Sequence, residues 1–198
     1  MQRTLIAVWF GAAAAIFAQP ADYQLDPART KVNFTVGDTL HKVNGTFKLK
    51  SGSLHFDPAT GSVQGAVVVD AASGNSGSTG RDSRMNSKIL ESSRYPEIVF
   101  RPDRVEGKIA AEGTSAVRVH GVFSIHGAVH ELTVPARVQL SGGDLTAELT
   151  FQVPYVKWGM KNPSMLMLRV GDQVEISIHA VGSDPHASGV TTLSHSNR

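Results

Sequence analysis

The sequence predicts an all-β protein, an antiparallel barrel of about eight strands with one short helical insertion. Apolar and polar residues alternate with a period of two through most of the chain after Lys31, as they do in half-buried strands. The alternating runs lie close together and are joined mainly by short turns rich in glycine and aspartate, which is typical of an antiparallel meander. Closing that meander into a barrel removes its exposed edges.

Eight alternating runs follow one another along the chain. The second run changes phase at Gly52, which predicts a bulge or a bend, and the turn FDPATGS comes after it. The turn SGGD joins the sixth run to the seventh. The expected strands are 31–36, 46–56, 63–69, 98–100, 117–125, 132–140, 145–155 and 174–180.

The apolar face of the barrel is expected to point inward. An outer-membrane barrel would turn it outward, but such barrels carry girdles of aromatic residues at both interfaces. This chain has two Trp, one of them at position 9, and three Tyr. An eight-stranded barrel with an apolar interior either fills itself with side chains or holds one small apolar ligand.

The segment TGRDSRMNSKIL, residues 79–90, interrupts the alternation. Thr79 and Asp82 fit a capping box, in which the threonine hydroxyl accepts the amide proton of residue 82 and the carboxylate reaches back to the amide of Thr79. Met85, Ile89 and Leu90 would then share one helical face. The sequence therefore predicts a short helix whose apolar side closes one end of the barrel, before Tyr95-Pro96 leads into the next strand.

The two ends of the chain differ from the barrel in composition. Residues 1–18 combine one positive charge, an apolar run and small residues before a cleavage point after Ala18, as secretory signal peptides do. We therefore expect a periplasmic or secreted protein with three parts: a signal peptide, residues 1–18; a barrel, residues 19–182; and a polar, loose tail, residues 183–198.

Charge and cysteine content exclude several classes of function. Without residues 1–18 the chain has 18 basic and 17 acidic residues, with no run of either, so no nucleic-acid partner is expected. The chain has no cysteine, which excludes thiol nucleophiles, cysteine-type zinc sites and an acyl-cysteine anchor. We expect a protein without stable membrane insertion, a monomer or a homodimer.

Four stretches of the chain resemble one family. They are VNFTVGDTLHKVNGTF, STGRDSRMNSKILESSRYPEIVF, GVFSIHGAVHELTVPARV and VPYVKWGMKNPSMLMLRVGDQVEISI, and they span about Tyr23 to Val181. Together they resemble the YceI family, bacterial lipocalin-like proteins that bind polyisoprenoid lipids. The resemblance implies an extended antiparallel barrel, in the periplasm, whose lumen holds an isoprenoid tail or a related long-chain amphiphile.

Two groups of residues are candidates for contact with such a lipid. At the mouth, Arg81, Asp82 and Arg84 would orient a head group; the alternative is a helix cap with a partly solvated ion pair of small energetic value. Many family members have histidine where this chain has Arg84, and a guanidinium favours a phosphate or an acidic head. The candidate lumen residues are Phe34, Val36, Phe47, Leu49, Phe100, Phe123, Ile125, Leu132, Phe151, Val153, Tyr155, Trp158 and Met160.

Other motifs have two interpretations each. The eight histidines could indicate a metal site, but His126 and His130 flank a hairpin turn and lack the helical geometry of a chelating pair. We therefore expect the histidines to face solvent, and we expect no metal and no cofactor. Methionines 160, 165 and 167 form either a flexible gate or ordinary core, and Gly37 to Gly45 either a mouth loop or a plain connection.

Three functions remain after these exclusions. The first is a non-catalytic barrel that binds, stores or transports an isoprenoid or similar amphiphile. The second is a secreted enzyme acting on a lipid or small amphiphile, although the chain has neither G-x-S-x-G nor H-E-x-x-H and no predicted pair of carboxylates inside the barrel. The third is a ligand-free, stress-related barrel, which differs from the first only in its lumen volume.

Overall fold

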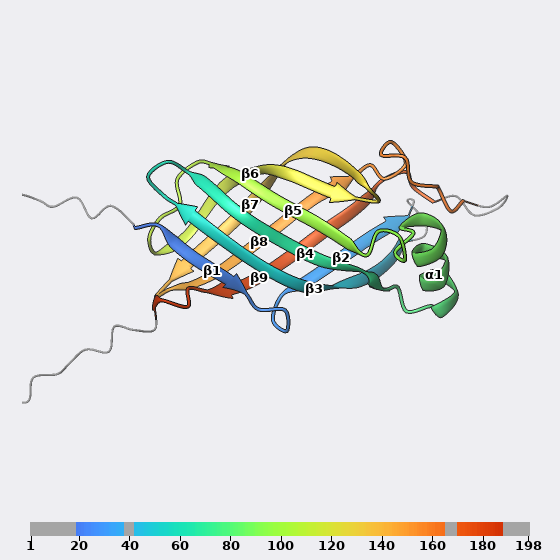
Figure 1. Ribbon diagram of the computed structural model, residues 1–198, viewed down its shortest axis with the longest axis horizontal. Helices are drawn as coiled ribbons and strands as arrows, with labels where there is room; N and C mark the ends of the chain where they lie inside the picture. The colour runs from blue at the N-terminus through green and yellow to red at the C-terminus, as the bar shows by residue number, and fades with distance from the viewer. Residues whose placement is uncertain (1–18, 38–41, 165–169, 188–198) are drawn as a thin grey trace, which may run out of the picture.

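The computed structural model describes residues 19–37, 42–164 and 170–187, which form one elongated barrel with a helical segment across one end (Figure 1). The helical segment consists of α1 (Thr79–Arg84) and a π-helical turn η1 (Met85–Ile89). The strands are β1 (Ala21–Leu25), β2 (Lys31–Gly37), β3 (Lys42–Asp57), β4 (Ser62–Asn75), β5 (Glu97–Glu106), β6 (Gly113–Ile125), β7 (Ala128–Ser141), β8 (Asp144–Val153) and β9 (Val174–Ser183).

In the described part of the chain, eight of the nine strands form a closed antiparallel ring. Around the ring, β2 lies between β3 and β9, the strands then follow in descending order from β9 to β4, and β4 pairs with β3 to complete the circle. Every pairing is antiparallel. The predicted eight-stranded barrel with a short helical insertion is confirmed.

Strand β1 was not predicted, and it shares one position of the ring with β2. β2 pairs with one half of β3, where Val32 lies opposite Phe47, and β1 pairs with the other half, where Tyr23 lies opposite Leu54. Both strands also pair with β9. A turn separates them, in which the side chain of Asp26 accepts a hydrogen bond from the amide of Ala28 (2.8 Å). β1 and β2 together therefore occupy one strand position of the ring, divided by the turn.

The predicted irregularity near Gly52 is a β-bulge in β3. The register with β4 shifts between Leu49 and Ser51, and both Lys50 and Ser51 are exposed. After this shift Gly52 is buried against Leu25 of β1, and a Cβ at Gly52 would lie 2.5 Å from Leu25 Cδ1. The missing side chain of Gly52 makes room for β1.

The apolar face points into the barrel, as predicted. The most deeply buried large side chains are Val134 of β7 and Val153 of β8, each 2% exposed. Among the described residues, Val129 is the one large apolar side chain that is largely exposed, and it lies at the start of β7. The same part of the chain has no helix that is long and apolar enough to span a membrane.

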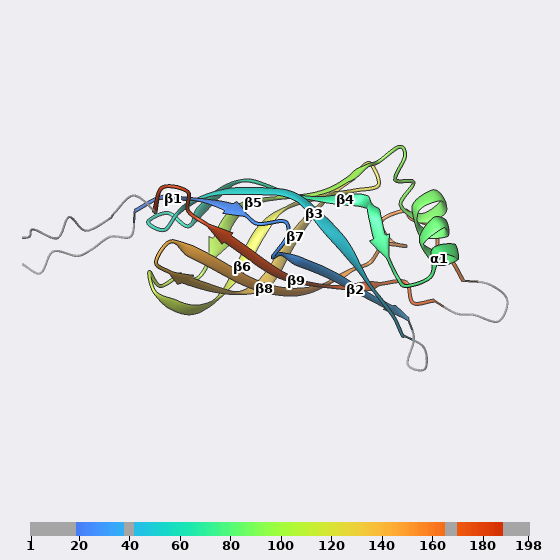
Figure 2. The same cartoon turned by 90° about the horizontal axis from the view of Figure 1, so that it is seen from below.

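The helical segment lies over one end of the barrel (Figures 1 and 2), which we call the helical end. Its apolar residues Met85, Ile89 and Leu90 pack into the hydrophobic cluster at that end, as predicted. The predicted capping box is wrong, because the N-cap is Ser78 and no side chain caps the helix. Asp82 instead accepts hydrogen bonds from the amide (2.8 Å) and hydroxyl (2.6 Å) of Ser76. The left-handed Gly77 (φ 78°) between Ser76 and the helix lets the chain turn there.

The predicted end segments lie mostly outside the described residues. This applies to the whole signal peptide, residues 1–18, and to most of the polar tail. At the start of that tail Ser183 still belongs to β9, and the amide of Asp184 donates to the carbonyl of Gly143 (2.8 Å).

Candidate ligand-binding lumen

The interior of the barrel contains two neighbouring cavities. The inner cavity, of about 160 Å³, lies toward the end where β1 is found, and the outer cavity, of about 330 Å³, lies under the helical segment. Six residues line both cavities, and each comes from a different strand. They form a ring that we call the waist: Val32, Val69, Ile98, Phe123, Phe151 and Ile178.

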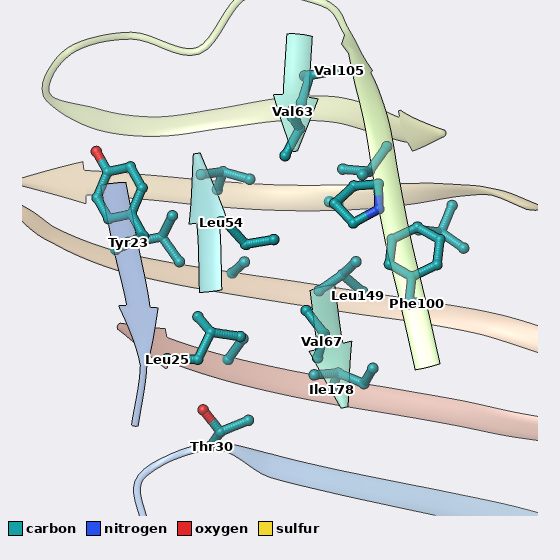
Figure 3. A pocket seen from close by; sticks show the side chains of 18 of the residues that line it. Tyr23, Leu25, Thr30, Leu54, Val63, Val67, Phe100, Val105, Leu149 and Ile178 are labelled. Carbon is teal, nitrogen blue, oxygen red and sulfur yellow. The ribbon is translucent and has the colours of Figure 1, made fainter. Parts of the chain in front are cut away.

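The inner cavity is almost entirely apolar. Figure 3 shows aliphatic and aromatic side chains from strands on all sides of it, including Leu25, Leu54 and Leu149. Its two hydroxyl-bearing residues are Tyr23 and Thr30. The Thr30 hydroxyl is already hydrogen bonded, because it donates to the carbonyl of Val181 (3.3 Å) and accepts from the amide of the same residue (3.1 Å).

Burial raises the pKa of Tyr23, and the charge of Asp184 adds to that effect. Tyr23 is therefore uncharged at neutral pH. Among the described residues, the inner cavity thus offers a ligand an apolar lining with no ionised group. Such a surface suits hydrocarbon, because apolar contact is favourable and no charge has to be desolvated.

The outer cavity has an apolar wall and a polar rim. Its wall includes Phe34, Phe47 and Tyr155. Burial raises the pKa of Tyr155, with a further contribution from Asp172, and its hydroxyl donates to the carbonyl of Gly171 (2.6 Å). The polar residues of the rim are Ser76, Arg81, Asp82 and Arg84. A ligand in this cavity would place a polar head at the rim and an apolar chain toward the waist.

The three predicted mouth residues do meet at this rim, but they differ in their contacts. Arg81 donates from Nε to the Ser76 hydroxyl (3.1 Å) and from Nη2 to the Ser76 carbonyl (3.0 Å). The hydrogen bonds from Ser76, and secondarily the charge of Arg81, hold the pKa of Asp82 below its usual value. Arg81 and Asp82 therefore hold the start of the helical segment, whereas Arg84 lines the cavity one turn further on.

Twelve of the thirteen predicted lumen residues line one or both cavities. The exception is Trp158, whose indole stacks on the imidazole of His130 (centroids 3.9 Å apart, planes at 6°) and packs near Phe123 (5.8 Å). Trp158 supports the wall from the loop after β8. Whether the twelve residues contact a ligand remains a prediction.

Several lining residues were not predicted. Tyr23 and Leu25 were missed with β1, although they alternate with polar neighbours. Val134, Ala136 and Val138 belong to a predicted apolar face of β7 but were not chosen as candidates. Their position near the inner end of the lumen depends on the strand register, which alternation alone does not give.

The prediction that the histidines face solvent does not hold for His130. This residue lies opposite Phe123 in the β6–β7 pair, in phase with the inward-facing Leu132, and its Nε2 atom is buried without a hydrogen-bond partner. Burial lowers the pKa of His130. Two other histidines are also partly covered, since His120 bonds to Asp103 (2.7 Å) and His126 lies 3.5 Å from a carboxylate oxygen of Glu91.

No group of three or more metal-ligating side chains occurs in the described part of the chain. Of the predicted methionine gate, Met160 is buried (3% exposed) and lines the outer cavity, whereas methionines 165 and 167 lie outside the described residues. Gly37 ends β2, and Gly45 lies within β3, so the predicted mouth loop is mostly strand where it is described.

Comparison with known proteins identifies similar chains. Residues 23–182 match the sequence profile of the YceI-like domain. Among solved structures, BcnA of Burkholderia cenocepacia is similar, with a TM-score of 0.68 and 22% identity, over 79% of this chain and 98% of that one. A polyisoprenoid binding domain from Saccharophagus degradans implicated in plant cell wall breakdown has a TM-score of 0.64 and 18% identity, over 82% and 98%.

A YceI protein of Campylobacter jejuni has the same fold, with a TM-score of 0.60 and 20% identity, over 74% of this chain and 88% of that one. No curated protein matches the chain. At these identities the solved structures share the fold with this chain.

Proposed function

This chain belongs to the YceI-like family, and we propose that its barrel binds a long, mainly apolar amphiphile, an isoprenoid lipid, within the lumen. One observation carries the proposal: the barrel interior is not filled, and its two apolar cavities adjoin at the waist. The structurally similar polyisoprenoid binding domain of Saccharophagus degradans supports the choice of lipid class.

The length of the lumen fits a long chain. Along β8, the lining extends from Leu145 in the inner cavity to Val153 in the outer cavity. Eight residue steps at roughly 3.3 Å each correspond to about 26 Å of strand, before the strand tilt is considered. A ligand that occupied both cavities would therefore be an extended chain, and a compact small molecule would fill one cavity only.

The energetics of burial favour such a ligand. Each buried CH2 group contributes about 0.8 kcal/mol, so twenty carbons give a gross term near 16 kcal/mol. Association and ordering costs of several kcal/mol or more reduce that figure. The apolar tail alone can therefore sustain tight binding, and the rim has only to orient the head.

We propose a binding protein, for storage or transport, in preference to an enzyme. Asp82 is the one carboxylate that lines the described part of the two cavities, and Ser76 holds it with a lowered pKa. Paired carboxylates for acid–base chemistry require a second group with a different pKa close by. We further propose that the protein is exported to the periplasm or secreted after loss of residues 1–18.

The proposal predicts that lipid accompanies the protein and that filling the inner cavity excludes long chains. Ala136, 5% exposed, lines the inner cavity, so Ala136→Phe should place a ring where the tail would lie. The neighbouring Ala116 is exposed on β6, opposite Arg137, and Ala116→Phe is the matched control on the outer surface. Lipids extracted from each purified protein would be identified by mass spectrometry, and uptake of labelled prenyl alcohols of ten and twenty carbons would be measured.

Wild type and Ala116→Phe should carry lipid and bind both alcohols. Ala136→Phe should lose most of its affinity for the twenty-carbon alcohol and retain the ten-carbon alcohol, which fits the outer cavity. Melting temperatures would show that all three proteins are folded. Lipid-free wild-type protein that takes up neither alcohol would contradict the proposal and favour a ligand-free barrel.

A further inference from the structure

Two of the six waist residues are aromatic. Phe123 of β6 and Phe151 of β8 line both cavities, and the other four residues of the waist are aliphatic. The two rings meet edge to face, with their centroids 6.3 Å apart and their planes at 79°. A chain that passes from the outer cavity into the inner one must therefore pass two aromatic rings, which are the largest side chains of the waist.

Phe123 has a further ring beside it, the indole of Trp158. The two ring centroids are 5.8 Å apart, and the planes make an angle of 43°. Trp158 lines neither cavity, so it contacts Phe123 outside the space that a ligand would occupy. Phe123 is 8% exposed, and in a close-packed interior a ring moves only where its neighbours leave room. Phe123 can therefore move aside for a passing chain only if Trp158 also moves.

The imidazole of His130 holds the indole in place. The two rings are stacked, with centroids 3.9 Å apart and planes at 6°. His130 also lies directly opposite Phe123 in the β6–β7 pair, and it lines neither cavity. Trp158 thus contacts both members of one cross-strand pair, one by stacking and the other with a tilted ring. Such aromatic contacts stabilise a particular arrangement of the rings beyond the apolar area that they bury.

Backbone hydrogen bonds in the loop after β8 also fix the position of Trp158. Its amide donates to the carbonyl of Pro154 (3.1 Å), and the amide of Met160 donates to the carbonyl of Tyr155 (3.0 Å). The Tyr155 hydroxyl in turn donates to the carbonyl of Gly171 (2.6 Å). Tyr155 and Met160 are both buried on either side of Trp158 in the sequence. The loop therefore holds the indole at its backbone, and His130 holds it at the ring.

We propose that Trp158 is a positioning residue of the waist: it keeps Phe123 in the path of a chain and so slows the passage of long chains into and out of the inner cavity. The inference rests on the proposed function, because it concerns the same ligand in the same lumen. Trp158 acts through Phe123 and not through contact with the ligand. Its loss should therefore change the rates of exchange more than the affinity, and only for chains that extend past the waist.

The test compares two prenyl alcohols, one of ten carbons that fits the outer cavity and one of twenty carbons that extends past the waist. Radiolabelled alcohol would be mixed with the protein to give the association rate constant and chased with unlabelled alcohol to give the dissociation rate constant. Equilibrium dialysis would give the dissociation constant. The variants are Trp158→Ala, Trp158→Leu and the conservative Trp158→Phe.

Tyr95→Ala is the matched control. The ring of Tyr95 packs on the imidazole of His126, with centroids 4.9 Å apart, and Tyr95 lines neither cavity. The control therefore removes an aromatic ring from another histidine of the same hairpin without touching the waist. Melting temperatures of all the proteins would be measured. Trp158→Leu, which keeps an apolar side chain at this position, gives the same comparison if Trp158→Ala does not fold.

In the wild type, the twenty-carbon alcohol should exchange more slowly than the ten-carbon alcohol. Trp158→Ala should raise both rate constants of the twenty-carbon alcohol by on the order of tenfold. Its dissociation constant should stay within about threefold, because the two rate constants change together. The rates of the ten-carbon alcohol should also stay within about threefold of the wild type. Trp158→Phe and Tyr95→Ala should both retain slow exchange of the longer alcohol.

Several results would overturn the inference and leave the proposed function intact. Equal exchange rates of the two alcohols in the wild type would show that the waist is no barrier. Trp158→Ala with an unchanged ratio of the two exchange rates would show that Trp158 only supports the wall. Exchange as fast in Trp158→Phe or in Tyr95→Ala as in Trp158→Ala would mean that the rate does not depend on a ring beside Phe123. Wild-type protein that binds neither alcohol would remove both the inference and the proposed function.

Discussion

At the residue scale, His130 has an unusual environment for an ionisable side chain. Its Nε2 atom is buried without a hydrogen-bond partner, and its ring lies flat against Trp158. The sequence indicates an inward direction for this side chain, because His130 is in phase with the apolar residues Leu132 and Val134. The histidines were expected to face solvent because they lack the geometry of a metal site, whereas the indole of Trp158 gives the imidazole of His130 a stacking partner.

This environment makes the stability of the protein depend on pH. Burial lowers the pKa of His130 in the folded protein below the ordinary value of about 6.5. Above about pH 6.5 the side chain is neutral in both states and has no effect. As the pH falls below that value, the unfolded chain takes up the proton more readily, so the free energy of unfolding should decrease until the folded pKa is passed.

We expect His130→Phe to weaken that dependence, because phenylalanine keeps the stacking on Trp158 and cannot be protonated. Urea unfolding of wild type and variant between pH 7.5 and pH 5 would measure the difference. The substitution replaces no other ionisable residue, so the difference between the two profiles reports on position 130. Identical pH profiles for the two proteins would show that His130 is not responsible.

At the scale of the element, β1 depends on a single missing side chain. Gly52 lies beneath Leu25, where a Cβ would come within 2.5 Å of Leu25 Cδ1. Gly52→Val should therefore displace β1 and lower the free energy of unfolding by about 1–3 kcal/mol, as overpacking does. Urea denaturation would give the value.

The corresponding test is a double-mutant cycle with Leu25→Ala. This substitution alone should lower the free energy of unfolding by about 2–5 kcal/mol, because Leu25 is buried. In the double variant the valine at position 52 occupies the space that Leu25 leaves, so the two decreases in the free energy of unfolding should not add. Strict additivity would argue that Gly52 and Leu25 do not compete for the same space.

The elements also show how far the sequence predicts this fold. Regular alternation predicted the eight ring strands, and the phase change at Gly52 predicted the bulge, because both follow from the two-residue period of a strand. β1 has only Tyr23 and Leu25 as buried residues and ends at the turn around Asp26, which is too short a pattern to recognise. Asp82 bonds to Ser76 and not to Thr79, since local helix rules do not include a turn at Gly77.

At the scale of the whole molecule, the lumen is two cavities in line, and the prediction concerns the length of the ligand. For neutral prenyl alcohols, affinity should rise with chain length while each additional CH2 is buried, by about 0.8 kcal/mol per group at most. It should stop rising when the inner cavity is occupied. The heat-capacity change of binding should become more negative over the same range.

Isothermal titration calorimetry on a series of alcohols would measure both quantities. In Ala136→Phe, the affinity should stop rising at a shorter chain length than in the wild type. An affinity that is independent of chain length would contradict binding in the lumen. The sequence predicted an apolar interior but not its volume, because the space left inside depends on how the side chains of facing strands interdigitate.

For the proposed ligand, the waist would determine the order of events in loading and release. Six side chains from six strands form it, and Tyr23 and Leu25 of β1 pack with Leu145 in the lining of the inner cavity. A chain that enters from the helical end must pass the waist with its hydrocarbon terminus leading. The part of the proposed ligand that enters last would leave first, so a receiving membrane or protein would meet the polar terminus before any of the hydrocarbon is uncovered.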